Sequence, residues 1–106
     1  MITDELVEKS LDYLRDNAEE SAQAKANRVY MEEFRKSLKA QIMSEHLAES
    51  IGAQERYAYS DVRYLNHLEA LKEAVFLDER HRFLRSAAEA KIEAWRTMSS
   101  NVRARL

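Results

Sequence analysis

Residues 3–49 read TDELVEKSLDYLRDNAEESAQAKANRVYMEEFRKSLKAQIMSEHLAE, a stretch with neither glycine nor proline. Apolar and small residues recur along it at intervals of three and four, which is the period of a helix and not of a strand. Thr3 can cap the first turn, and two acids follow it. The stretch therefore predicts one long helix over about residues 3–49. Its expected contact stripe comprises Leu11, Leu14, Ala18, Ala22, Ala26, Tyr30, Phe34, Leu38 and Ile42.

The second half of the chain predicts another long helix after a short link. Gly52 is the only glycine, and we expect it to adopt the left-handed conformation that ends many helices. The link is predicted at about residues 50–60, as a helical turn or an irregular segment. Ser60-Asp61 then offers a cap for a helix over about residues 61–103. Near Asp78-Glu79 the apolar pattern shifts, which predicts a bend or a change of packing partner.

These patterns together predict an all-α fold. A fold built from sheets needs tight turns, and one glycine with no proline among 106 residues supplies almost none of them. We expect a single helical domain over residues 1–106, with two long helices in an antiparallel hairpin. A hairpin buries one stripe of each helix, so a second stripe on the C-terminal helix would stay unpaired and favour a helical homo-oligomer. That stripe comprises Phe76, Phe83, Ala87, Ala90 and Ala94.

The composition excludes several functional classes. The chain has no cysteine, which removes disulfides and thiolate chemistry, and one glycine cannot form a phosphate-binding loop. The three histidines are scattered, and Asp78 with His81 echoes only part of a di-metal carboxylate site. We therefore expect a protein that is not an enzyme and that carries no cofactor and no metal. Without a long apolar run or a basic leader, we expect it to be cytoplasmic and without a membrane partner.

Charge is distributed unevenly along the sequence. Residues 1–20 hold seven acids and two bases, whereas residues 80–106 hold two acids and seven bases, although the net charge of the whole chain is only -2. A basic end of this kind can bind a polyanion, and an acidic end can pair with it. The helix dipole offers an equally good explanation, because it favours acids at helix N-termini and bases at C-termini.

Basic and aromatic residues alternate in two places. Proteins that bind single-stranded nucleic acid combine cations along the backbone with aromatic rings that stack on bases. Trp95 also lies in the second of these places, on the C-terminal helix. Its position on the apolar seam of that helix, however, predicts a core residue. The alternative interpretation is that the tyrosines cover the core and the arginines are solvated. The predicted nucleic-acid contacts are Arg56, Tyr57, Tyr59 and Arg63 at the link, supported by Arg80, Arg82, Arg85 and Lys91 on the C-terminal helix.

Residues 78–96, with Ser100-Asn101-Val102-Arg103 after them and residues 64–71 before them, carry a family resemblance. This part of the chain, about residues 60–103, resembles the C-terminal helix of small proteins of tailed bacteriophages. Such proteins are distantly similar to the UvsY-like recombination mediators. The resemblance implies a helical oligomer that binds single-stranded DNA and helps a RecA-like recombinase displace single-strand-binding protein. It also implies action in the cytoplasm of a host cell.

The sequence therefore leaves three functional hypotheses. The first is a mediator-like accessory protein of recombination, whose partners are further copies of itself, single-stranded DNA and a RecA-like recombinase. The second is a helical structural or adaptor protein that binds only protein partners. The third is an inhibitor that uses its acidic N-terminal helix as a mimic of DNA, and the bases Arg28, Arg35, Lys36 and Lys39 argue against it.

Overall fold

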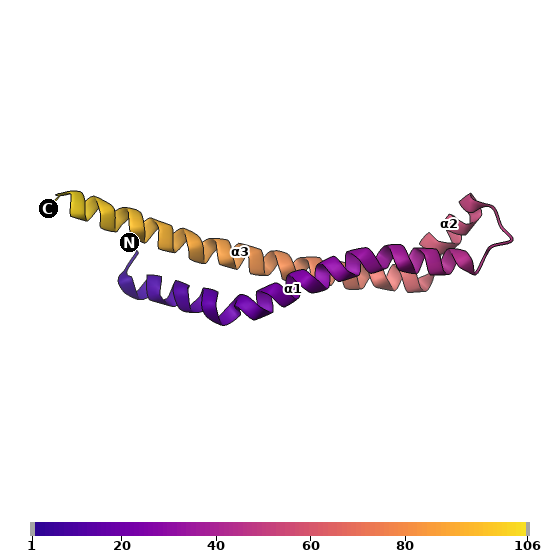
Figure 1. Ribbon diagram of the computed structural model, residues 1–106, viewed down its shortest axis with the longest axis horizontal. Helices are drawn as coiled ribbons and strands as arrows, with labels where there is room; N and C mark the ends of the chain where they lie inside the picture. The colour runs from indigo at the N-terminus through magenta and orange to yellow at the C-terminus, as the bar shows by residue number, and fades with distance from the viewer. Residues whose placement is uncertain (1, 106) are drawn as a thin grey trace. The chain divides into compact units, whose positions relative to one another are not determined.

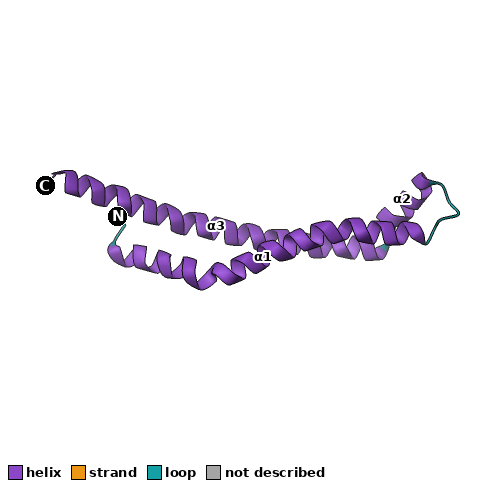
Figure 2. Cartoon of the chain, in the orientation of Figure 1, coloured by secondary structure: helices purple, strands orange, loops and turns teal. Residues whose placement is uncertain are grey.

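The computed structural model describes residues 2–105 and contains three helices (Figures 1 and 2). Helix α1 spans Asp4–Ser44, helix α2 spans Ile51–Ser60 and helix α3 spans Val62–Arg105. Within those described residues there is no strand. The all-α fold predicted from the scarcity of turn-forming residues is therefore confirmed.

The chain divides into two compact units, and α1 packs against α3 in each of them. The terminal unit comprises the described residues up to Gln23 and from Glu79 onward, and the central unit comprises Ala24–Asp78. In the terminal unit the Trp95 indole N–H donates to the Asp4 carboxylate at 2.6 Å, and Arg85 donates to the Ser21 hydroxyl. The residue number on α3 falls from 95 to 85 as the number of its partner on α1 rises from 4 to 21. The two helices are therefore antiparallel, as predicted. The division falls at Asp78-Glu79, where the apolar pattern shifts.

The central unit holds the larger apolar core. Leu38, Ile42, Ala58 and Tyr64 are buried there, and Phe34, Met43 and Leu68 pack against them. Ile42 is the only large side chain in the described part of the chain that is completely buried. The core joins α1, α2 and α3 of this unit, because Ala58 of α2 closes over residues from both long helices. The predicted positions of Phe34, Leu38 and Ile42 on the contact stripe are confirmed here, whereas Tyr30 of the same stripe is 65% exposed and Ala26 is exposed as well.

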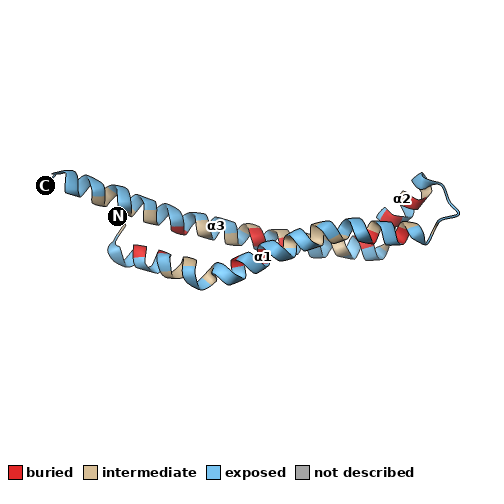
Figure 3. Ribbon diagram, viewed as in Figure 1, coloured by how far each residue is buried: buried red, intermediate tan, exposed pale blue. Residues whose placement is uncertain are grey.

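In the terminal unit the buried face of α1 differs from the predicted one. Val7, Ser10 and Ser21 are buried, whereas Leu11 is 52% exposed and Ala18 and Ala22 are also exposed (Figure 3). Small hydroxylated residues can fill a close helix contact because their hydroxyls bond within the helix; the Ser10 Oγ donates to the carbonyl oxygen of Leu6 at 2.9 Å. The more apolar stripe of α1 therefore remains on the surface of this unit.

The predicted link is largely a helix. Helix α1 ends at Ser44 rather than near residue 49, and turns occupy residues 45–48 before α2 begins at Ile51. The Ser50 hydroxyl caps α2 by accepting a hydrogen bond from the Ala53 N–H at 3.2 Å. Gly52 lies in the first turn of α2, and no glycine adopts a positive φ. The predicted left-handed glycine is therefore wrong, since the cap at Ser50 makes the glycine unnecessary for the turn.

Two predicted helix caps are confirmed. The Thr3 Oγ1 accepts a hydrogen bond from the Leu6 N–H at 3.2 Å at the start of α1. The Asp61 carboxylate accepts from the Arg63 N–H at 2.8 Å at the start of α3. These bonds satisfy amide groups that have no partner within the helix.

Large apolar side chains remain exposed on the surface of each unit. The predicted second stripe of α3 is exposed, with Phe76 at 63% and Phe83 at 64% of their full accessibility, and Ala87, Ala90 and Ala94 are exposed as well. None of the helices, over the residues that the structure describes, combines the length and apolar content needed to cross a membrane. The structure thus contains unpaired apolar surface without a membrane-spanning segment.

Candidate nucleic-acid interface

The eight predicted contact residues fall into two groups. Arg56, Tyr57, Tyr59 and Arg63 belong to the central unit, on α2 and the first turn of α3. Arg80, Arg82, Arg85 and Lys91 belong to the terminal unit, along α3. The predicted contacts are therefore divided between the two units.

The position of α2 exposes both of its tyrosines. Ala58 is completely buried, so the residues on either side of it lie at the edges of the contact. Tyr57 is 45% exposed and Tyr59 is 48% exposed. The Ser60 hydroxyl donates to the Arg56 carbonyl oxygen at 2.7 Å and closes the last turn of α2. The helix therefore displays two rings from a fixed backbone.

The two tyrosine rings have different partners. The Tyr57 ring stacks on the His46 ring with 4.0 Å between the ring centres and 5° between the planes. The Tyr59 ring meets Tyr64 edge-on, and the Lys39 Nζ lies 4.8 Å from the Tyr59 ring centre. Tyr57 and His46 therefore form a two-ring aromatic stack, whereas the Tyr59 ring is bordered by another ring and a cation.

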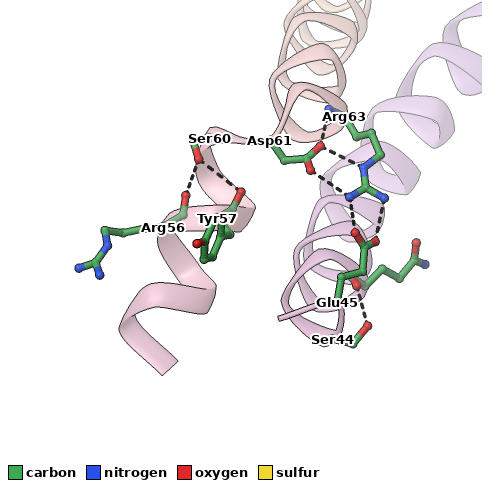
Figure 4. A network of polar contacts seen from close by, with 8 residues as sticks. Ser44, Glu45, Arg56, Tyr57, Ser60, Asp61 and Arg63 are labelled. Atoms are coloured by element: carbon green, nitrogen blue, oxygen red, sulfur yellow. Dashed lines mark hydrogen bonds and ion pairs between the residues drawn. The ribbon is translucent and has the colours of Figure 1, made fainter. Parts of the chain in front are cut away.

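Arg56 is the cation next to this stack. Its side chain is exposed and forms no ion pair or hydrogen bond with any other described residue. In Figure 4 its guanidinium points away from the polar network around Arg63. Arg56 and Tyr57 line a shallow hollow of about 270 Å³, together with Glu49, Ala53 and Ser60. A free guanidinium and a half-exposed ring thus share one small surface.

Arg63, by contrast, is engaged by two carboxylates. Its guanidinium donates to both oxygens of Glu45 at 2.8 and 2.9 Å, and to Asp61 at 2.9 and 3.0 Å (Figure 4). These hydrogen bonds raise the pKa of Arg63 and lower the pKa of Glu45 and of Asp61. Arg63 therefore joins the turn that follows α1 to the start of α3, a role that the sequence did not reveal because Glu45 lies 18 residues away.

This network predicts a loss of stability in acid. The carboxyl groups of Glu45 and Asp61 have ordinary pKa values of 4.5 and 3.8 and lower values in the folded chain. Their contribution is complete above the ordinary values and is lost as the pH falls through the lowered ones. We expect the melting temperature to fall between about pH 5 and pH 2, and to fall less in Arg63→Gln. Equal pH profiles of the two proteins in thermal circular dichroism would contradict this.

The α3 group contains two engaged and two free cations. Arg82 pairs with Glu79 at 2.7 Å and lies over the Phe83 ring, while Arg85 donates to the Ser21 hydroxyl. Arg80 and Lys91 are exposed and make no hydrogen bond or ion pair with other described residues. Of the predicted cations, the structure therefore leaves Arg56, Arg80 and Lys91 unneutralised.

Trp95 is not the buried core residue predicted from the seam. Its side chain is half-buried, because the indole N–H reaches the Asp4 carboxylate at the edge of α1. The ring borders a hollow of about 550 Å³ in the terminal unit. The other residues that line this hollow are Ile2, Asp4, Arg96, Met98, Ser99, Val102 and Arg103.

The described part of the chain, residues 2–105, contains no cluster of three or more histidine, cysteine, aspartate or glutamate side chains that could hold a metal ion. Asp78 is bound by Arg28 at 3.2 Å, so its carboxylate serves the contact between α1 and α3. No known protein-family model, curated protein or solved structure matches the chain.

Proposed function

We propose that this protein is a non-enzymatic, homo-oligomeric accessory protein that binds single-stranded DNA in the cytoplasm. The observation that carries the proposal is that the free Arg56 guanidinium shares a hollow with Tyr57, whose ring stacks on His46 from the turn before α2. A cation beside an exposed ring is the unit from which non-sequence-specific single-strand binding is built. The mediator-like part of the proposal, loading of a RecA-like recombinase, rests on the family resemblance of residues 60–103.

The acids around α2 are compatible with such a ligand because most of them are already paired. Glu45 and Asp61 share the single positive charge of Arg63, and Glu55 lies 3.7 Å from the Lys39 Nζ. Glu49 is the exception, since it lines the hollow beside Arg56 without an ion pair in the described chain. Arg56 therefore shares its hollow with one carboxylate that has no cationic partner in the described chain.

Two matched substitutions test the site. Tyr57→Ala is expected to weaken binding of a labelled oligothymidylate by roughly 1–3 kcal/mol, the usual contribution of one stacked base. Glu49→Gln is expected to strengthen binding, because it removes the uncompensated carboxylate. Lys72→Ala is the control, since Lys72 is also exposed and unpaired within the described part of the central unit. Fluorescence anisotropy measures all four proteins, and equal affinity for Tyr57→Ala and the wild type would refute the site.

The salt dependence of the same binding tests the electrostatic part. Each phosphate contact releases counterions, so the affinity should fall steeply between about 50 and 200 mM salt, and Arg56→Ala should make the slope shallower. Loading is then tested by the ATPase activity of a RecA-like recombinase on single strands coated with single-strand-binding protein. We expect the activity to rise when the wild-type chain is added.

A second candidate function is a helical adaptor that binds only protein. The observation in its favour is that Arg63, Arg82 and Arg85 are engaged within the chain, while Phe76 and Phe83 remain exposed. Under this hypothesis no oligonucleotide binds at low salt, and the Tyr57→Ala and Arg56→Ala variants behave as the wild type. Self-association in the absence of any DNA binding would favour it over the first proposal.

A further inference from the structure

The terminal unit separates acidic and basic residues onto different helices. Its α1 segment, Asp4 to Gln23, holds seven acids and two bases, and its α3 segment, Glu79 to Arg105, holds three acids and seven bases. The ion pairs of Lys9, Arg15 and Arg96 each lie within one helix. In these pairs the acids of α1 are therefore not paired with the bases of α3.

Two unpaired acids on α1 match two unpaired cations on α3. Glu8 and Glu19 are exposed and have no ion pair or hydrogen bond within the described chain, as is also true of Arg80 and Lys91. The members of each pair are eleven residues apart, since 19 − 8 and 91 − 80 are both 11. Eleven residues make three turns of about 5.4 Å, so each pair occupies one side of its helix at the same separation.

Apolar and small residues lie between the charges on both helices. On α1 these are Leu11, which is 52% exposed, and the exposed Ala18. On α3 they are Phe83 at 64%, Leu84 at 42% and the exposed Ala87. Leu84, Ala87 and Lys91 also border a groove of about 240 Å³, whose other residues are Leu6, Lys9, Ser10, Tyr13 and Ala88. Each surface therefore carries apolar or small residues between two unpaired charges of one sign, and the two intervals are equal.

We propose that the α1 segment Asp4 to Gln23 of a second copy of this chain docks on the α3 surface of the first. Glu8 and Glu19 of one copy then pair with Arg80 and Lys91 of the other, and Leu11 and Ala18 cover the stripe that includes Phe83. Arg15 does not oppose the contact, because Asp12 and Asp16 hold it. The inference rests on the homo-oligomer in the proposed function and assigns Arg80 and Lys91 to assembly instead of to DNA.

Charge reversal on each surface tests the contact. One variant carries Glu8→Lys and Glu19→Lys, and the other carries Arg80→Glu and Lys91→Glu. Each is expected to raise the dissociation constant of self-association by roughly a hundredfold, because like charges then face one another. An equimolar mixture of the two variants is expected to recover the mass of the wild-type assembly, since opposite charges again meet. Light scattering after size-exclusion chromatography measures each mass without DNA, and circular dichroism checks that each variant folds.

A control variant and two contrary results keep the test independent of DNA binding. The variant with Glu69→Lys and Glu73→Lys reverses two exposed, unpaired acids on the part of α3 that belongs to the central unit. It should leave the mass of the assembly unchanged. A monomeric wild-type chain overturns the inference, as does a mixture that stays at the mass of its separate variants. Failure of the anisotropy assay with an intact assembly would instead refute only the DNA-binding proposal.

Discussion

Replacing Ile42 with alanine is expected to lower the free energy of unfolding by about 2–5 kcal/mol. Ile42 is completely buried among Leu38, Ala58 and Tyr64, where α1, α2 and α3 of the central unit meet. Alanine would remove apolar contacts and leave a cavity that three helices cannot easily close. Urea denaturation followed by circular dichroism at 222 nm measures the change.

The matched control is Leu47→Ala. Leu47 is 75% exposed and lies in the turn before α2, so its truncation should change the free energy of unfolding by less than about 0.5 kcal/mol. A loss for Ile42→Ala as small as that of the control would mean that this core does not stabilise the central unit.

Replacing Arg28 with methionine is expected to destabilise the chain by about 1–3 kcal/mol. The Arg28 guanidinium lies 3.2 Å from the Asp78 carboxylate, and the Asp78 side chain is only 12% exposed. Methionine keeps most of the side-chain length but leaves a buried carboxylate without this cation, which is costly. The same denaturation experiment measures the loss.

The double variant Arg28→Met/Asp78→Leu separates two explanations of that loss. If the unpaired carboxylate causes it, replacing both charged groups with apolar ones should restore most of the stability. If lost packing of Arg28 causes it, the double variant should be no better than the single one. Lys36→Met is the exposed control, because both members of the Lys36–Glu33 pair are 67% exposed and such pairs contribute little.

The helices could be predicted from the sequence, but the buried face of α1 could not be predicted along its whole length. Thr3 and Asp61 mark the starts of α1 and α3, because capping depends on residues close in sequence. Which face is buried depends on the partner helix, and in the terminal unit α3 accepts the small Ser10 and Ser21 instead of Leu11. Apolarity alone therefore selected the wrong face there.

The residue types of the candidate site could be predicted from the sequence. Which of its arginines are paired with carboxylates could not. The alternation of arginine and tyrosine left open whether the rings cover the core or are exposed; Tyr57 and Tyr59 are exposed, whereas Tyr64 is buried. The pairing of Arg63 with Glu45 depends on how the chain folds back between α1 and α3, so no local pattern reveals it. The same holds for the His46 ring under Tyr57, which comes from the turn before α2.

The polar contact between α1 and α3 in the terminal unit has a mechanical consequence. Ser10 donates to Leu6 and Asn17 donates to Tyr13, so these two side chains form hydrogen bonds within α1 and not across to α3. Small side chains also form only shallow ridges on a helix, so they obstruct the movement of a neighbouring helix less than large side chains do. The register of α1 against α3 in this unit therefore depends on the side-chain hydrogen bonds that do cross, from Trp95 to Asp4 and from Arg85 to Ser21. A ligand or partner that displaced them would free α1 to shift along α3 by a turn.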